Sequence, residues 1–241
     1  MNAKHPTNTG EVVAAVKHIA IRSLHRIRLW NRMERKEERF TMKTIVIATK
    51  NNGKIREMKD AFAHLPVALV PLSEFGNLPD AVEDGDTFEE NAKIKALFYM
   101  KETGVACLAD DSGLEVEALG NAPGVHSARF AGEHATDEAN NEKMLAEITK
   151  KGIASSPAAY RCVLAYADTD GTVLTSEGSC RGVIRPAVKG DGGFGYDPYF
   201  YIEKNKTMAE LTLAEKDAIS HRGNALRRMA KKLAAYFKTE K

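Results

Sequence analysis

The sequence has little cysteine and no long hydrophobic run. Its three cysteines, Cys107, Cys162 and Cys180, are odd in number, lie far apart and include no C-x-x-C pair. This usage argues against a zinc site and suits buried thiols in a reducing cytoplasm. No apolar run approaches the roughly 20 residues of a membrane span, and the N-terminus lacks the apolar core of a secretory signal. We therefore expect a cytoplasmic protein with no membrane partner.

A strong charge of either sign is also missing from most of the chain. The overall net charge is +2, but residues 1–41 hold 9 Lys and Arg against 4 Asp and Glu, whereas residues 42–241 hold 26 against 29. The basic excess is therefore confined to the first 41 residues. The mildly acidic remainder is not expected to bind nucleic acid stably.

Residues 1–41 are predicted to be a basic appendage, helical or disordered. Apolar side chains recur at helical spacing between residues 11 and 30, and the charged run Glu34–Arg39 follows. A membrane-surface helix and a transit peptide are the functional alternatives. We favour an appendage translated from an over-early start, because Met42 opens a typical domain.

Residues 42–241 are predicted to form one elongated α/β domain. Ile45–Ala48 has the pattern of a short buried strand, Thr49–Lys54 that of a polar loop, and a helix is indicated after it by Ile55, Met58, Phe62 and Leu65. Further helices are expected from the capping boxes Thr87–Glu90 and Thr212–Glu215 and from Thr136, and strands at Val105–Ala109, Ala158–Asp168 and Thr172–Val183.

The loop TKNNGK, Thr49–Lys54, has features of an anion site. A loop between a strand and a helix presents free backbone N–H groups and the positive end of the helix dipole. Lys54 adds a full charge, and Asn51 and Asn52 add neutral donors. It is not a Walker loop, because it has one glycine and Ile55 follows the lysine. An ordinary turn is an equally good interpretation of this stretch alone.

Two acidic stretches are candidates for metal or catalytic chemistry. Glu83 lies in an irregular loop with no local task and is free to face a ligand. Asp110 and Asp111 follow an apolar strand, and open α/β sheets bind ligands at strand ends. Neighbouring strand residues point to opposite faces, so one acid is expected to support a turn at Ser112-Gly113 while the other faces a cleft.

An acid in such a cleft needs a proton, a cationic side chain or a metal ion. Because the available ligands are oxygens and no Cys/His cluster occurs, Mg²⁺ is the natural ion. The alternative, that both acids cap the turn or pair with Arg or Lys, is at least as good for this stretch alone.

The C-terminal part offers a surface for a flat ligand. Phe194 lies in the glycine-rich stretch GDGGFGYDPYF, where the backbone can approach a ring that stacks on the phenylalanine. Lys216, His221 and Arg222 could donate to the carbonyl oxygens of a purine. The alternatives are a glycine-rich turn with a core phenylalanine and a solvated basic face with Ser220 as a helix cap.

Together, and in this order, these stretches resemble the inosine/xanthosine triphosphate pyrophosphatase family. The resemblance covers about 200 residues from Met42 onward and does not cover residues 1–41. It rests on Thr49-x-Asn51-x-x-Lys54, Glu83-x-Gly85-x-Thr87-Phe88-x-Glu90-Asn91-Ala92, Ala109-Asp-Asp-Ser-Gly-Leu114, Pro123-Gly124 with Ser127-Ala-Arg129, Gly193-Phe-Gly-Tyr-Asp-Pro198, and Glu215-Lys216 with Ser220-His-Arg-Gly223.

The resemblance implies a homodimeric α/β enzyme with a long mixed sheet between two lobes and a central nucleotide cleft. It implies Mg²⁺-dependent hydrolysis of ITP, dITP or XTP to the monophosphate and pyrophosphate. By position, Asp111 would activate water and bind metal together with Glu83, and Asp110, Glu90, Asn91 and Lys93 would support them. The substrate-binding residues would be Thr49, Lys50, Asn51, Asn52, Gly53, Lys54 and Ser112 for the phosphates, Phe194, Gly195, Tyr196 and Asp197 for the base pocket, and Lys216, His221 and Arg222 for the purine edge.

Three other functions remain open at this point. A related pyrophosphatase could prefer modified pyrimidines or methylated bases. A nucleic-acid-binding module with residues 22–39 as a basic arm is disfavoured by the acidic body and the lack of interleaved aromatics. A non-catalytic nucleotide sensor is disfavoured because Glu83 and Asp111 are both present.

Overall fold

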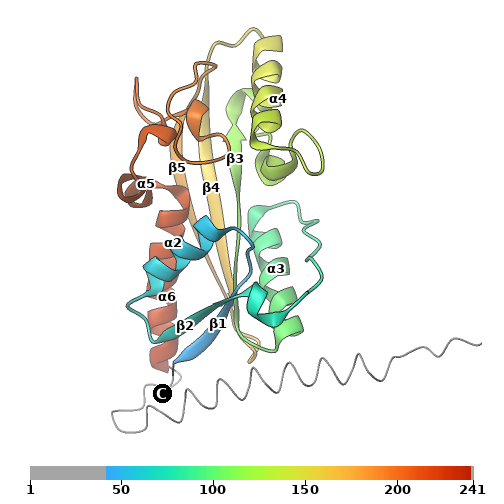
Figure 1. Ribbon diagram of the computed structural model, residues 1–241, viewed down its shortest axis with the longest axis vertical. Coiled ribbons are helices and arrows are strands. Elements are labelled where there is room, and N and C mark those ends of the chain that lie inside the picture. Colours follow the sequence, from blue (N-terminus) through green and yellow to red (C-terminus); the bar gives the residue numbers. More distant parts are fainter. Residues whose placement is uncertain (1–41, 240–241) are drawn as a thin grey trace, which may run out of the picture. The chain divides into compact units, whose positions relative to one another are not determined.

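The chain divides into two units after Thr41, and the structure, a computed structural model, describes residues 42–239 (Figure 1). The expectations about residues 1–41 lie outside the described residues. Within residues 42–239, no helix is long and apolar enough to cross a membrane.

A six-stranded mixed sheet, in the order β2-β1-β3-β4-β5-β6, forms the centre of the described unit. β1 pairs in parallel with β2 and β3, and the later pairings are antiparallel. The long strands β3, β4 and β5 run along the unit, so the expected elongated α/β fold with a mixed sheet is confirmed (Figure 1). The strands are β1 (Lys43–Ile47), β2 (Val67–Pro71), β3 (Cys107–Val116), β4 (Ser156–Ala167), β5 (Val173–Ile184) and β6 (Phe200–Tyr201).

Helices cover both faces of this sheet and bury three apolar clusters. α2 and α6 pack on one face, α3 packs on the other, and α4 covers the far part of the sheet (Figure 1). The helices are α2 (Asn52–Phe62), α3 (Phe88–Thr103), α4 (Asp137–Lys150), α5 (Leu213–Ile219) and α6 (His221–Thr239). Short 3-10 turns of the described unit are η1 (Leu72–Phe75), η2 (Glu117–Leu119), η3 (Gly124–Arg129), η4 (Asp197–Tyr199) and η5 (Met208–Glu210).

Local sequence signals locate several of these elements correctly. Both capping boxes are formed, by Thr87 with Glu90 and by Thr212 with Glu215. The predicted hairpin is β4 and β5, which pair along their whole length. The local hydrogen bonds that these residues satisfy do not depend on the rest of the fold, which is why the sequence alone predicts them.

The expected end of the third strand at Ala109 is wrong. β3 continues through both acids to Val116, and Ser112 and Gly113 are strand residues rather than a turn. The physical reason is pairing with β4, which opposes every residue from Cys107 to Val116. Gly113 also lets η3 approach the strand, since a Cβ there would lie 2.3 Å from the carbonyl oxygen of Gly124.

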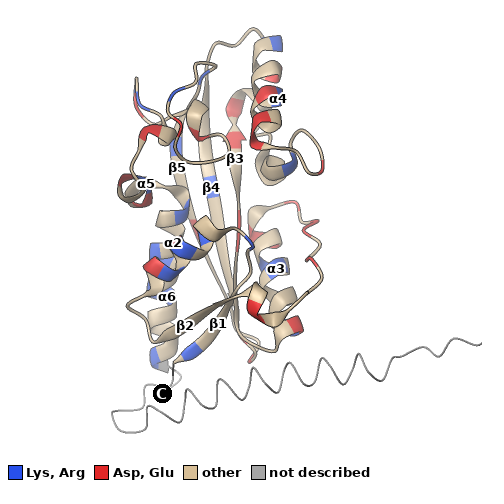
Figure 2. Cartoon of the chain, in the orientation of Figure 1, with Lys and Arg blue, Asp and Glu red and all other residues tan. Residues whose placement is uncertain are grey.

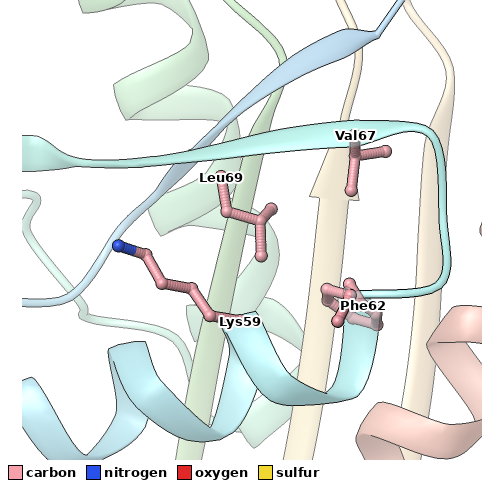
Figure 3. Close-up of a pocket in the computed structure, with 5 residues that line it drawn as sticks. Lys59, Phe62, Val67 and Leu69 are labelled. Carbon is pink, nitrogen blue, oxygen red and sulfur yellow. The ribbon is translucent and has the colours of Figure 1, made fainter.

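An apolar hollow lies between the end of α2 and β2 (Figure 3). Phe62, Val67 and Leu69 line it together with the side chain of Lys59. No carboxylate lines this hollow, so it does not coincide with the acidic residues that the sequence singles out.

Candidate active site

Asp110 and Asp111 lie in the middle of β3, just beyond the end of β1. β1 opposes β3 only at Cys107 and Leu108, so the sheet loses one neighbour where the two acids begin. Their contacts diverge, as the strand alternation predicts. Asp110 contacts residues of α2 and α6, whereas Asp111 is influenced by residues of α3 and of the loop before it.

Asp111 is a half-buried carboxylate with one buried oxygen that accepts no hydrogen bond within residues 42–239. Its Oδ1 accepts the N–H of Ser112 at 2.9 Å, and its Oδ2 has no hydrogen-bond partner among the described residues. Burial raises the pKa of Asp111 to about 6, the Lys95 ammonium opposes this rise, and Glu83 adds to it. The group is therefore mainly ionised at neutral pH, yet basic enough to accept a proton.

The loop before α3 carries Glu83 toward this site and is acidic along its length (Figure 2). The Glu83 carboxylate pairs with Lys95 at 2.6 Å, and its carbonyl oxygen accepts a hydrogen bond from Arg129 at 3.3 Å. The N–H of Gly85 donates to Asn91 Oδ1 at 2.8 Å. Three separate contacts thus hold the loop in place.

Lys95 is a site residue that the sequence reasoning missed. Its ammonium contacts Glu83, donates to the carbonyl oxygen of Asp110 at 2.9 Å and acts on Asp111. Lys93, which was expected to support the site, pairs instead with Glu89 on the exposed side of α3. Helical spacing could have distinguished the two lysines, because Lys95 lies four residues after Asn91 and shares its face.

Asp110 was expected to support a turn, but it forms ion pairs with two cationic side chains instead. It is 1% exposed and pairs with Lys54 at 2.8 Å and with Arg222 Nε at 3.4 Å. Although burial alone would raise its pKa, Lys54 and Arg222 outweigh burial and lower it. Arg222 also contacts Glu57 at 3.1 Å and Ser112 Oγ at 3.2 Å. Both phosphate-loop and C-terminal residues therefore meet at Asp110.

The predicted phosphate loop is partly the first turn of α2. The helix begins at Asn52 rather than after Lys54, because Asn51 caps it. Asn51 Oδ1 accepts the N–H groups of Gly53 and Lys54, and the role of the Asn51 amide as a donor to a phosphate stays a prediction. Lys50 forms an exposed ion pair with Asp80.

The ring of Phe194 lies beside the predicted basic residues. It is 45% exposed, with the Lys216 ammonium 4.6 Å and the Arg222 guanidinium 5.9 Å from its centre. Arg222 thus connects this ring to Asp110 and Ser112. Arg222 therefore brings a residue expected at the base, Phe194, near Ser112, which is expected at the phosphates.

A buried polar network lies behind this ring. Asp197 accepts hydrogen bonds from Tyr160 at 3.1 Å, from Lys216 at 2.5 Å and from the N–H of Phe194 at 3.1 Å. His221 stacks on Tyr160, and its Nδ1 has no partner among the described residues. Tyr196, in contrast, is buried and donates to the carbonyl oxygen of Ser127. Asp197 and Tyr196 thus hold the backbone around Phe194, while His221 has a nitrogen that makes no hydrogen bond within the described residues.

Unfolding experiments should show that His221 lowers stability under acidic conditions. Burial, with Arg222, Lys216 and Lys54 nearby, lowers its pKa well below 6.5, although Asp110 opposes this. As the pH falls through about 6.5, the unfolded chain binds a proton that the folded chain does not, so the free energy of unfolding decreases. We expect a loss of about 1–2 kcal/mol between about pH 8 and about pH 5.

Urea titrations of His221→Gln across this range measure the effect. In His221→Gln, the free energy of unfolding should no longer fall by this amount as the pH decreases, whereas in the exposed control His64→Gln it should fall as in the unmodified chain. The same slope in His221→Gln and in the unmodified chain would contradict the assignment.

The oxygen donors of the site suit a hard divalent cation. Glu83 and Asp111 supply carboxylates, and Asp111 Oδ2 is buried without a hydrogen-bond partner in the described part of the chain. Among residues 42–239, no three Asp, Glu, His or Cys side chains gather as a closed metal cage. An ion at these two acids would need further oxygen ligands from water and substrate, which is the usual arrangement of Mg²⁺ at phosphate sites.

Comparison with known proteins identifies the family to which the chain is related. Residues 45–232 match the Ham1 family. A Syntrophobacter fumaroxidans protein named dITP/XTP pyrophosphatase is 53% identical over 183 residues, covering 76% of this chain and 78% of that protein. A Geobacter sulfurreducens protein of the same name is 49% identical over 186 residues, or 77% and 94% of the two chains. The structure of a HAM1 protein from Coxiella burnetii has a TM-score of 0.75 at 41% identity and covers 80% of this chain and 100% of that chain. Because the family match spans most of the described unit and these relatives share its sequence and fold, the chain belongs to the Ham1 family.

Proposed function

We propose that this protein is a pyrophosphatase that hydrolyses non-standard purine nucleoside triphosphates, ITP, dITP and XTP, to the monophosphate and pyrophosphate. The observation that carries the proposal is the buried oxygen of Asp111, which has no hydrogen-bond partner among the described residues. The adjacent Asp110 is connected through Arg222 to the exposed ring of Phe194. Relatives of this chain named dITP/XTP pyrophosphatase support the same activity.

The triphosphate would lie along the cationic part of the site. Lys54, Ser112 and the N-terminal end of α2 would neutralise and orient its oxygens, because phosphoryl chemistry depends on positioning and charge compensation. Lys95 would hold Glu83 close to Asp111. Lys50 would reach the phosphates only after leaving its pair with Asp80.

Asp111 would accept a proton from the attacking water. In the absence of a cation, its pKa of about 6 leaves it ionised at neutral pH and able to accept a proton. A bound divalent cation would favour the ionised form further. Mg²⁺ held by Glu83 and Asp111 would neutralise the phosphate oxygens and make the bound water more acidic. Asn91 lies close enough to favour the charged form of Asp111.

The base would stack on Phe194 and meet Lys216 and His221 at its edge. Hypoxanthine and xanthine present a carbonyl oxygen at C6, where adenine presents an amino group, so donors at this edge would be left unpaired by adenine. The guanidinium of Arg222 already has Asp110, Glu57 and Ser112 as partners. For Arg222 to read the purine edge as well, it would have to exchange one of these partners.

Replacing Lys54 by alanine should mainly weaken nucleotide binding. The variant loses a full charge near the phosphates, and Asp110 keeps Arg222 as a partner. A loss of about 1.5–3 kcal/mol for a charged hydrogen bond predicts that KM for ITP rises about 10- to 150-fold. Steady-state kinetics measure this, with the exposed Lys59→Ala as a control on the same helix. An unchanged KM would argue against the role.

Replacing Phe194 by alanine should weaken binding of the base and not of the phosphates. Stacking of a base on an aromatic ring contributes about 1–3 kcal/mol, so the inhibition constant of inosine monophosphate should rise about 5- to 150-fold. Inhibition by pyrophosphate should stay the same, because pyrophosphate has no base. Equal weakening of both inhibitors would contradict a stacking role.

Pyrophosphate release from ITP, XTP, dITP, GTP and ATP tests the proposed function, with and without Mg²⁺. Release from the first three in the presence of Mg²⁺ is expected. Preference for modified pyrimidine triphosphates would overturn the substrate assignment, and release without a divalent cation would overturn the metal assignment. The same assay on a chain that starts at Met42 tests whether residues 1–41 contribute to activity.

Assembly and location complete the proposal. We expect a cytoplasmic homodimer that binds a nucleotide and does not bind nucleic acid stably. Light scattering of the full chain during size-exclusion chromatography tests the dimer, and a monomeric mass would contradict it.

A further inference from the structure

One helix of the far part of the sheet holds both polar backbone groups of Gly195. The N–H of Gly195 donates to Asp137 Oδ2 at 2.6 Å, and its carbonyl oxygen accepts from Asn141 Nδ2 at 2.9 Å. Asp137 and Asn141 lie four residues apart on α4 and therefore share one face of the helix. Two side chains of α4, both far from Gly195 in the sequence, thus bind the backbone of this glycine on both sides; we call this pair of contacts the clamp.

This glycine directly follows Phe194, the exposed ring of the base site. Gly195 has a φ of +64°, a left-handed backbone conformation that residues with a side chain rarely adopt. The space next to its α carbon is open, so the backbone conformation and not crowding favours glycine here. The N–H of Phe194 donates to Asp197, and the hydroxyl of Tyr196 donates to Ser127. The backbone around the ring is therefore held on both sides.

Phe194 needs such external support, because almost half of its surface is exposed. A ring with few packing contacts of its own takes its position from the backbone that carries it. The backbone contacts of Gly195 with α4 are well suited to provide this, since they connect the base site to a helix that packs on a separate apolar cluster through Met144 and Ile148.

Helix formation explains only part of this arrangement. An acid in the first turn, such as Asp137, complements the helix dipole whatever it contacts. Helix formation does not explain Asn141, because asparagine is unfavourable in a helix interior and this side chain is buried. Its amide donates to Gly195 and to the carbonyl oxygen of Asp137, so its contacts lead to the clamp.

We propose that Asp137 and Asn141 are positioning residues that hold Phe194 ready to stack on the base. They act through Gly195 and have no part in the phosphate chemistry. The proposal rests on the proposed function, because it takes Phe194 as the surface on which the base binds.

Kinetics of an Asp137→Ala/Asn141→Ala variant of the full chain test the proposal. KM for ITP and the inhibition constant of inosine monophosphate should rise about 5- to 50-fold, whereas kcat and the inhibition constant of pyrophosphate should change less than about twofold. Asp137→Asn, which keeps an acceptor oxygen, should behave like the unmodified chain. Glu138→Ala is the matched control, because Glu138 is an exposed acid of the same helical turn that bonds to Thr136 and to its own backbone.

Hydrogen exchange followed by mass spectrometry gives a second readout that needs no activity. Peptides spanning residues 193–197 should exchange faster in the double variant, whereas peptides of the Glu83 loop should not change. Equal weakening of both inhibitors, or unchanged exchange at residues 193–197, would overturn the proposal. If the unmodified chain did not hydrolyse ITP, the proposed function would fail, and exchange together with binding of inosine monophosphate would still decide whether the clamp supports a base site.

Discussion

Replacing Asp111 by asparagine is expected to remove turnover of ITP and to leave the chain folded. The amide keeps an oxygen that can accept the N–H of Ser112, so the local contact at 2.9 Å survives. It cannot accept a proton from water, and it offers a cation one neutral oxygen instead of a carboxylate. Loss of a general base costs about 10²- to 10⁴-fold in rate, and kcat should fall by at least that factor.

Rate and stability must be measured on the same preparations of this variant. The unfolding temperature should change little. The Asp111→Asn change removes a negative charge and with it the repulsion between Asp111 and Glu83, which offsets part of any lost contact. Glu115→Gln is a matched control, since it makes the same acid-to-amide change four residues further along β3 and on the same face. A kcat for Asp111→Asn within about tenfold of the control would contradict the role of Asp111 as the base.

Replacing the adjacent Asp110 by asparagine should have the opposite main effect, a large loss of stability. The variant leaves Lys54 and Arg222 without the buried charge that both contact. Removing one partner of a buried ion pair costs about 3–5 kcal/mol, which for a domain of this size corresponds to a fall in the unfolding temperature of about 6–20 °C.

A double-mutant cycle locates the source of this loss. Asp110→Asn and Arg222→Met are compared singly and together by urea unfolding. If the two side chains stabilise each other, the double variant will lose less stability than the sum of the single variants. Additive losses, or an Asp110→Asn variant as stable as the unmodified chain, would refute the role of Asp110 as the buried partner of two cations.

The two adjacent acids illustrate how far the sequence could be interpreted. The alternation of side chains on a strand depends only on local geometry, so their divergence to opposite faces was predictable, and the contacts confirm it. That Asp111 is the catalytic acid stays a prediction, which came from the family resemblance. The expectation that Asp110 supports a turn was wrong, because Ser112 and Gly113 are strand residues. The alternative, pairing with Arg or Lys, holds for Asp110, and the sequence could not name the partner because Arg222 lies 112 residues further along the chain.

Local patterns in the sequence were enough to predict the α/β class, the helix caps at Thr87 and Thr212 and the hairpin of β4 and β5, and the order of the motifs indicated the family. These features arise from hydrogen bonds and apolar spacing within short stretches of chain. Three features became visible only in the folded chain: β3 runs through both acids, Lys95 rather than Lys93 pairs with Glu83, and α4 holds Gly195. Each of these depends on strand pairing or on a side chain meeting a segment that is distant in sequence, and the free energy of such contacts exists only once the chain has folded.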